Sequence, residues 1–418
     1  VGAYAGDAIT DADYNVAVGV NALGANTLGS RNVAVGQQAL QSANVTSAAD
    51  TYNTALGYAA GAAVTTGTGN TLMGGLAGDA LTDADNNVAI GYSSLGANTV
   101  GSRSTAIGTY ALEVQNPASA VNMYNTALGY GSGQSVTTGI ENTLIGGLAG
   151  AGTTTGRENA ASGRKALFAN TTGSYNTAFG ATALAANTTA DNNTAHGYRS
   201  LYLSTTGASN TAIGIFSIGG AVTTGDNNTG LGYATLYELT SGSNNTALGR
   251  DAGRAGSPSG SITTGSNIIV LGDDAVANAH IQVDWTVASD ARDKTDFTAL
   301  DLGLEFVKDL QPVTYKWDKR SKYGDKTADD YDLNAQTPDG THKEDWLDIG
   351  FKAQEVEALE IAAGYNKNNN TNLVSSHTGD GKQMGLQYSK FVPILVKAIQ
   401  EQQALIESLT ARITTLEG

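Results

Sequence analysis

The residues best placed to carry chemistry are a serine and a lysine five positions apart, Ser289 and Lys294, in the run Ser-Asp-Ala-Arg-Asp-Lys. A serine hydroxyl becomes a nucleophile when a neutral amine accepts its proton, so the two residues have the chemistry of a Ser–Lys dyad. Five residues turn through about 140° of a regular helix, so the side chains can meet only across a turn. Taken alone, these six residues favour a structural reading, with Ser289 as a helix N-cap and Lys294 in solvent.

Composition divides the chain at the same place. Residues 1–288 hold 44 of the 53 glycines but only 8 of the 23 Lys and Arg residues. The net charge is −16 and both parts are acidic, so a nucleic-acid-binding surface is not expected. The absence of Cys excludes disulfides and thiolate metal sites. The sequence has no run of 18 apolar residues, so no membrane-spanning helix is predicted. Because the chain opens on Val1 rather than Met, we expect that an N-terminal segment precedes it.

Residues 1–272 consist of one repeated unit, Asn-x-Ala-x-Gly, degenerate in places and most often spaced 17 residues apart. Short alternating strands and glycine turns predict stacked β-coils, whereas frequent glycine disfavours a helix. Fifteen coils about 4.8 Å apart would form a rod of roughly 70 Å. Because bulky apolar residues are few, we expect several chains to pack together. The repeat positions are Asn15, Asn32, Asn53, Asn70, Asn87, Ser104, Asn125, Asn142, Asn159, Asn176, Asn193, Asn210, Asn228, Asn245 and Asn267.

These units resemble the head repeats of trimeric autotransporter adhesins and the repeats of phage tail fibres. The resemblance implies a left-handed parallel β-roll that assembles as a homotrimer, although the units of those families are often shorter than 17 residues. It therefore supports a parallel, stacked and trimeric rod more firmly than it supports the shape of one coil.

Several repeat residues are candidates for binding. Insertions at 43–52, 114–124 and 253–261 would form loops, which either carry binding residues, as loops often do, or are neutral variation in length. The acidic turns at 11–13 and 83–85 could bind Ca²⁺, but they complete no Ca²⁺ loop and also favour turns, so no metal or other cofactor is predicted. Glycan hydrolysis would need two carboxylates that converge in a cleft, and the repeats show no such pair, so no turnover enzyme is predicted there. An exposed aromatic row could stack on receptor sugars, or its rings could simply cover the roll; it consists of Tyr58, Tyr92, Tyr130, Tyr198 and Tyr233.

Four blocks follow the repeats in a fixed order, at 289–294, 310–317, 349–356 and 388–401. Together they resemble the endosialidase-type intramolecular chaperone domain at the C-terminus of phage tailspikes and fibres, across essentially all of residues 289–418. The resemblance implies a domain that trimerises, templates the β-structure before it and then cuts itself off. The family signature Ser-Asp-x-x-x-Lys assigns the catalytic roles to Ser289 and Lys294.

The resemblance also implies cleavage beside the serine, in the first place at the Ser289–Asp290 bond. Attack by the hydroxyl on its own carbonyl would close a strained four-membered ring. Attack on the Ala288 carbonyl closes a five-membered ring, and attack on a neighbouring chain closes none, so the bond that breaks stays open. Asp290 and Asp293 would favour the charged form of Lys294, so we expect that trimer assembly must desolvate the amine before cleavage.

The chain ends in a predicted coiled coil, with a heptad seam at Leu395, Ile399, Gln402, Ile406, Leu409, Ile413 and Leu416. We therefore predict a mainly β homotrimer in four parts. A parallel β-solenoid rod spans 1–272 and a junction spans 273–288. A small α+β chaperone domain spans 289–385, and the C-terminal helix and coiled coil span 386–418.

The predicted function is that of the distal part of a phage tail fibre or tailspike in the virion. It would bind a glycan or protein receptor on the host and join other tail proteins through the missing N-terminus. The chaperone would be a single-turnover serine endopeptidase, released after assembly in the host cytoplasm. The alternative is a bacterial trimeric adhesin or structural fibre at the cell surface that uses the same self-cleaving domain.

Overall fold

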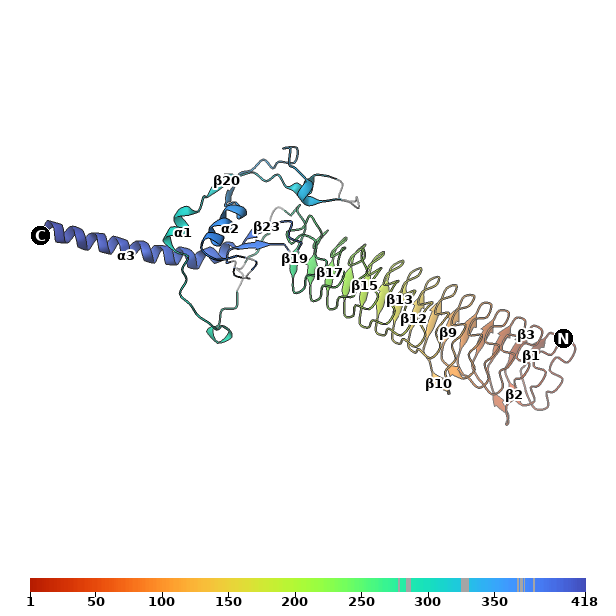
Figure 1. Ribbon diagram of the computed structural model, residues 1–418. Helices are drawn as coiled ribbons and strands as arrows, with labels where there is room; N and C mark the ends of the chain where they lie inside the picture. The colour runs from red at the N-terminus through yellow and green to blue at the C-terminus, as the bar shows by residue number, and fades with distance from the viewer. Residues whose placement is uncertain are drawn as a thin grey trace. The chain divides into compact units, whose positions relative to one another are not determined.

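The computed structural model describes residues 1–276, 279–282, 287–324, 331–366, 368, 371, 373–378 and 380–418. The described residues form two compact units (Figure 1). The first comprises residues 1–254 and 262–272, and the second comprises residues 255–261 and 273–418. Parts of the predicted junction, residues 277–278 and 283–286, lie outside the described residues.

The first unit is a stack of short parallel strands in chain order, which confirms the predicted solenoid with turns of about 17 residues. Neighbouring strands pair in register, with Ala17 opposite Ala34 and so on along the stack. The 15-stranded sheet comprises β1 (Val16–Val18), β3 (Val33–Val35), β5 (Thr54–Leu56), β6 (Thr71–Met73), β7 (Val88–Ile90), β9 (Thr105–Ile107), β11 (Thr126–Leu128), β12 (Thr143–Ile145), β13 (Ala160–Ser162), β14 (Thr177–Phe179), β15 (Thr194–His196), β16 (Thr211–Ile213), β17 (Thr229–Leu231), β18 (Thr246–Leu248) and β19 (Ile269–Leu271).

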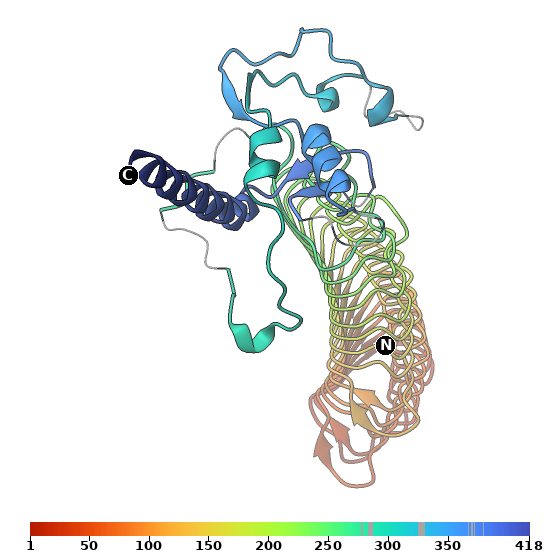
Figure 2. The same cartoon turned by 60° about the vertical axis from the view of Figure 1, so that its left-hand side comes forward.

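Two of the predicted insertions each contain a short strand outside the main sheet. The first insertion contains β4 (Ala49–Asp50), which pairs with β2 (Gly29–Ser30) of the preceding coil, and the second contains β10 (Val121–Asn122), which pairs with β8 (Gly101–Ser102). Both views show these strands on wide loops that project from the coils (Figure 1, Figure 2). The longer repeat intervals therefore extend single coils without breaking the main sheet.

Small residues make the narrow coils possible. The middle residue of most strands is an alanine that points inward and is fully buried, as at Ala34, Ala55 and Ala89. Side chains alternate between the two faces of a strand, so the flanking residues face outward. Leucines such as Leu23 and Leu40 fill the rest of the coil interior. Each coil thus shares one thin core with its neighbours.

An asparagine ladder links the coils through their buried amides. The backbone N–H of Asn70 donates to Oδ1 of Asn53 at 3.0 Å, and Nδ2 of Asn70 donates to the Ala84 carbonyl oxygen at 2.8 Å. Asn87 makes the same bond to Oδ1 of Asn70. These bonds satisfy backbone groups that would otherwise be buried without a partner, which explains why Asn precedes almost every strand.

The last coil corrects the sequence assignment. Asn267 was predicted to take the repeat position, but Ile268 occupies it and donates its backbone N–H to Oδ1 of Asn245 at 3.0 Å. Asn267 instead accepts a hydrogen bond from Nδ2 of Asn244 at 2.7 Å. The prediction was one residue early because an Asn stands directly beside the position that the motif requires.

The second unit is a small α+β region that ends in a long helix, as predicted. Its core includes Leu302, Phe306, Val356, Phe391 and Ile394. The predicted heptad residues lie on the final helix, where most of their apolar side chains are exposed. The elements are η1 (Ala291–Asp293), α1 (Leu304–Asp309), β20 (Val313–Tyr315), η2 (Arg320–Lys322), η3 (Leu333–Ala335), β21 (Asp348–Gly350), α2 (Ala353–Ala362), β22 (Ser375–His377), β23 (Met384–Leu386), η5 (Tyr388–Lys390) and α3 (Phe391–Glu417).

Candidate functional site

A single turn of 3-10 helix, η1, brings Ser289 and Lys294 together. The carboxylate of Asp290 begins this turn by accepting a hydrogen bond from the backbone N–H of Arg292 at 2.9 Å. The chain then reverses, and Nζ of Lys294 donates to Oγ of Ser289 at 2.6 Å. The amine therefore already lies within proton-transfer distance of the hydroxyl.

The N-cap of this turn is Asp290, so the structural reading of Ser289 as the cap is wrong. Asp290 also forms a close ion pair with Arg292, whose Nη2 lies 2.6 Å from Oδ2 and whose Nε lies 3.1 Å from both carboxylate oxygens. Hydrogen bonds from the Arg292 side chain and backbone lower the pKa of Asp290 below its usual value. One of the two carboxylates that were expected to favour the charged form of Lys294 is thus paired with Arg292.

Both members of the Ser–Lys pair are exposed to solvent in the single chain. The predicted desolvation of the amine therefore has no counterpart among the described residues of one chain. It stays a prediction about the assembled protein.

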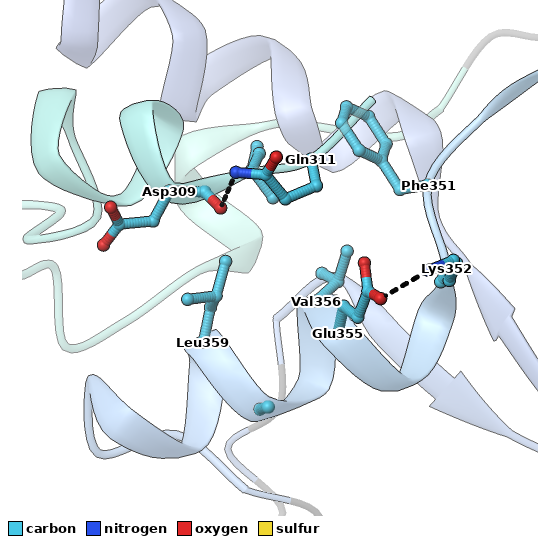
Figure 3. Close-up of a pocket in the computed structure, with 9 residues that line it drawn as sticks. Asp309, Gln311, Phe351, Lys352, Glu355, Val356 and Leu359 are labelled. Atoms are coloured by element: carbon cyan, nitrogen blue, oxygen red, sulfur yellow. Dashed lines mark hydrogen bonds and ion pairs between the residues drawn. The ribbon is translucent and has the colours of Figure 1, made fainter. Parts of the chain in front are cut away.

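A separate pocket lies between the end of α1 and α2 (Figure 3). Phe351, Val356 and Leu359 supply apolar walls, while Nζ of Lys352 pairs with Oε1 of Glu355 at 2.7 Å. Neither Ser289 nor Lys294 lines it. Its lining residues are Asp309, Leu310, Gln311, Phe351, Lys352, Glu355, Val356, Ala358 and Leu359.

The five tyrosines predicted to face a receptor are all on the surface, between 43% and 59% exposed. Tyr110 and Phe216 were missed by the sequence reasoning because each lies two residues after the repeat glycine rather than one. They extend the set into two rows of edge-to-face contacts, with ring centroids 5.5 to 6.4 Å apart: Tyr92–Tyr110–Tyr130 and Tyr198–Phe216–Tyr233. Tyr58 belongs to neither row.

The outer face of the solenoid sheet carries an apolar row that the motif search also missed. The third residue of most strands points away from the buried alanine, and many of these residues are large, apolar and exposed. His196 interrupts the row and packs against the Phe179 ring at 5.9 Å between centroids. We call the following residues the outer apolar row: Val18, Leu56, Leu128, Ile145, Phe179, Ile213, Leu231, Leu248 and Leu271.

The acidic turns do not gather into a metal site. Across the described ranges, no three His, Asp or Glu side chains are placed to hold an ion together. The Asp85 carboxylate instead accepts hydrogen bonds from the backbone N–H and hydroxyl of Thr68, at 2.7 and 2.9 Å. Nor does the described part of the chain contain a helix with the length and apolar character needed to cross a membrane.

Comparison with protein families gives one match. Residues 289–365 match the family model described as "Chaperone of endosialidase". The matched range begins at the serine of the Ser–Lys pair and ends just beyond α2. Neither the curated proteins nor the solved structures contain a match to the chain.

Proposed function

Because an endosialidase chaperone domain follows the β-solenoid repeats, we propose that this chain is the distal part of a phage tail fibre or tailspike. Domains of this type act in trimer assembly and are autoproteolytic serine peptidases. We further propose that Ser289 and Lys294 perform the cleavage. The observation that carries this assignment is the 2.6 Å contact between Nζ of Lys294 and Oγ of Ser289, within the matched range.

The proposed reaction is one acyl transfer followed by hydrolysis. The neutral amine of Lys294 takes the proton of Ser289 as Oγ attacks a peptide carbonyl, so a C–O bond forms. The C–N bond then breaks, and the departing amino group takes the proton from Lys294. Water hydrolyses the resulting ester, which restores the hydroxyl and leaves a new carboxylate. Desolvation of the amine on trimer assembly would make cleavage wait for folding.

The carbonyl that is attacked decides the product ends. Attack at Ala288 leaves Ser289 as the first residue of the released fragment. Cleavage of the Ser289–Asp290 bond leaves Asp290 as the first residue. If the serine of a neighbouring chain attacks the Ser289 carbonyl, no four-membered ring forms. N-terminal sequencing of the released fragment distinguishes the two bonds.

Two surfaces support a homotrimer. The outer apolar row follows a sheet of 15 strands, which at about 4.8 Å per strand extends over roughly 70 Å. With a width of about 10 Å, the row offers on the order of 700 Å², close to the roughly 800 Å² that each partner contributes to a stable interface. The exposed heptad seam of α3 offers a second self-complementary surface in the same chain.

The decisive test compares freshly folded wild type with Ser289→Ala and Lys294→Ala on a denaturing gel, with native mass measured on the same samples. We expect two bands and a trimeric mass from wild type, and one band with the same assembly state from each variant. Lys343→Ala, at another exposed lysine, is the matched control and should still give two bands. Two bands from either dyad variant would disprove the assigned residues.

Receptor binding belongs to the same proposal and rests on the exposed tyrosine rows. We expect Tyr198→Ala to weaken binding of the purified rod to host cells about tenfold, as loss of an aromatic anchor does. Tyr4→Ala, at a tyrosine that is 67% exposed and outside the rows, should bind as wild type does. Equal binding by both variants would show that Tyr198 does not contact the receptor.

A bacterial adhesin is the alternative function, and a secretion signal or anchor encoded upstream would favour it over a virion protein.

A further inference from the structure

The proposed cut does not separate the two compact units of the chain. The second unit includes residues 255–261 and 273–288, all of which precede Ser289. Cleavage beside Ser289 therefore divides one compact unit into a part that stays with the repeats and a part that carries the chaperone fold. Contacts across this division decide whether the two parts come apart.

The first set of contacts joins residues 255–261 to the loop between β22 and β23. The backbone N–H of Ser261 donates to Oδ2 of Asp380 at 3.1 Å. Nε2 of Gln383 donates to the Ala255 carbonyl oxygen at 3.1 Å. Gly260 is required for this approach, because a Cβ there would lie 2.6 Å from the Asp380 carboxylate oxygens.

Asp380 is itself held in place before it meets this segment. Its Oδ1 accepts hydrogen bonds from the Thr378 hydroxyl at 2.5 Å and from the backbone N–H of Lys382 at 3.0 Å. A carboxylate that is fixed in this way loses little further conformational freedom when it binds Ser261. The loop therefore presents a preformed acceptor to the residues on the other side of the cut.

The second set of contacts surrounds Asp274, whose side chain is only 9% exposed. Nζ of Lys319 donates to the Asp274 carbonyl oxygen at 2.8 Å, and the Ser321 hydroxyl donates to the carboxylate. Nζ of Lys322 lies 3.7 Å from the same carboxylate. Asp274 lies before the cut, whereas the two lysines and the serine around it lie after the cut.

We propose that the C-terminal fragment stays docked on residues 255–261 and Asp274 after the backbone is cut, so that scission and release are separate steps. This inference rests on the proposed self-cleavage. Before the cut, the covalent chain holds the partners together. After the cut, retention depends on these hydrogen bonds and on a charged pair that salt weakens. Release is then set by ionic conditions rather than by the peptide bond alone.

The test follows self-cleaved wild-type protein by size-exclusion chromatography and native mass spectrometry, at about 0.05 M and about 1 M salt. We expect the fragments to co-elute at low salt and to separate faster at high salt. Asp274→Asn combined with Gln383→Ala should speed release roughly tenfold, as loss of charged hydrogen bonds predicts. Asp273→Asn is the matched control, because the Asp273 carboxylate accepts a local hydrogen bond from the backbone N–H of Ala275.

A second measurement keeps docking testable apart from self-cleavage. In a Ser289→Ala background, a recognition sequence for a site-specific protease replaces residues 283–286, and the purified protein is cut by that protease. Uncut and cut samples are compared by native mass, which also reports whether the Asp274→Asn, Gln383→Ala variant has folded. If that variant does not fold, Lys322→Gln in the same background gives the comparison and should also release faster.

Separation of the two fragments at once at low salt would overturn the inference, and so would equally slow release from wild type and a folded variant. A wild type that never cuts itself would overturn the proposed function alone, because the protease-cut protein still reports docking.

Discussion

Oε2 of Glu360, in the second half of α2, accepts two hydrogen bonds from Ser375 at the start of β22. One comes from the Ser375 backbone N–H at 3.0 Å, and the other comes from the Ser375 hydroxyl. Two further backbone N–H groups, of Leu373 and Val374, donate to Oε1 at 2.7 and 2.6 Å. The carboxylate is fully buried. One side chain therefore fixes the entry of β22 against the helix.

Glu360→Gln should destabilise the second unit by about 2 kcal/mol, because the amide leaves a buried N–H or hydroxyl without its charged acceptor. Thermal unfolding with and without the substitution measures the loss. Glu355→Gln on the same helix is the control, since it removes only the exposed pair with Lys352 and should change stability by less than about 0.5 kcal/mol. Equal effects from the two variants would contradict the anchoring role.

The same carboxylate predicts a pH dependence. Burial alone would raise the pKa of Glu360, but hydrogen bonds from the Ser375 hydroxyl and from the backbone of Val374, Ser375 and Leu373 outweigh burial and lower it. Because the folded-state pKa lies below the unfolded value near about 4.3, this stabilisation is complete above that pH. It is lost as the pH falls through the folded-state value. Between about pH 7 and about pH 3, the free energy of unfolding should therefore decrease less steeply for Glu360→Gln than for wild type.

Arg292→Ala should slow self-cleavage roughly two- to fivefold, because Asp290 would become free to pair with Lys294 and hold it in the charged form. A time course on denaturing gels measures the rate. Asp290→Asn added to Arg292→Ala should restore the rate, since the amide no longer favours the ammonium. Arg412→Ala, at an exposed arginine of α3, should cleave at the wild-type rate. A double variant as slow as Arg292→Ala would show that Arg292 acts in another way.

Gly36→Ala should destabilise the rod by at least about 2 kcal/mol. Gly36 has a φ of +138°, and a Cβ there would lie 2.2 Å from the carbonyl oxygen of Gly57 in the next coil. Gly147→Ala offers a matched control, because nothing lies within 4 Å of its added Cβ. Thermal unfolding monitored by circular dichroism should separate the two, and similar midpoints would refute the steric argument.

Leu128→Lys should disrupt the trimer, because a charge would be buried in the proposed interface along the outer apolar row. Native mass should then show monomers or aggregates in place of a trimer. Glu141→Lys is the control, because it introduces a lysine at an exposed turn outside the row. Its backbone φ of 61° already accommodates the glutamate side chain, so the lysine adds no backbone strain. A trimeric Leu128→Lys protein would show that the row faces solvent.

The repeated spacing was enough to predict the solenoid, since a period of about 17 residues with inward alanines admits few other folds. The exact position of each repeat was harder to predict where the Asn is replaced, as the error of one residue at Asn267 shows. Sequence spacing also placed Ser289 and Lys294 across a turn, and the 2.6 Å contact is consistent with that geometry. The pairing of Asp290 with Arg292 could not be predicted, because it depends on the rotamers that the η1 turn selects.

The asparagine ladder has an end as well as a period. Ile268 donates its backbone N–H to Oδ1 of Asn245, but its own aliphatic side chain has no oxygen that could accept a hydrogen bond from a following coil. An open parallel sheet invites another strand at its edge, and a stack of near-identical coils would accept a second rod end to end. The final coil therefore presents no side-chain oxygen, in line with the ladder, that could accept the backbone N–H of another strand.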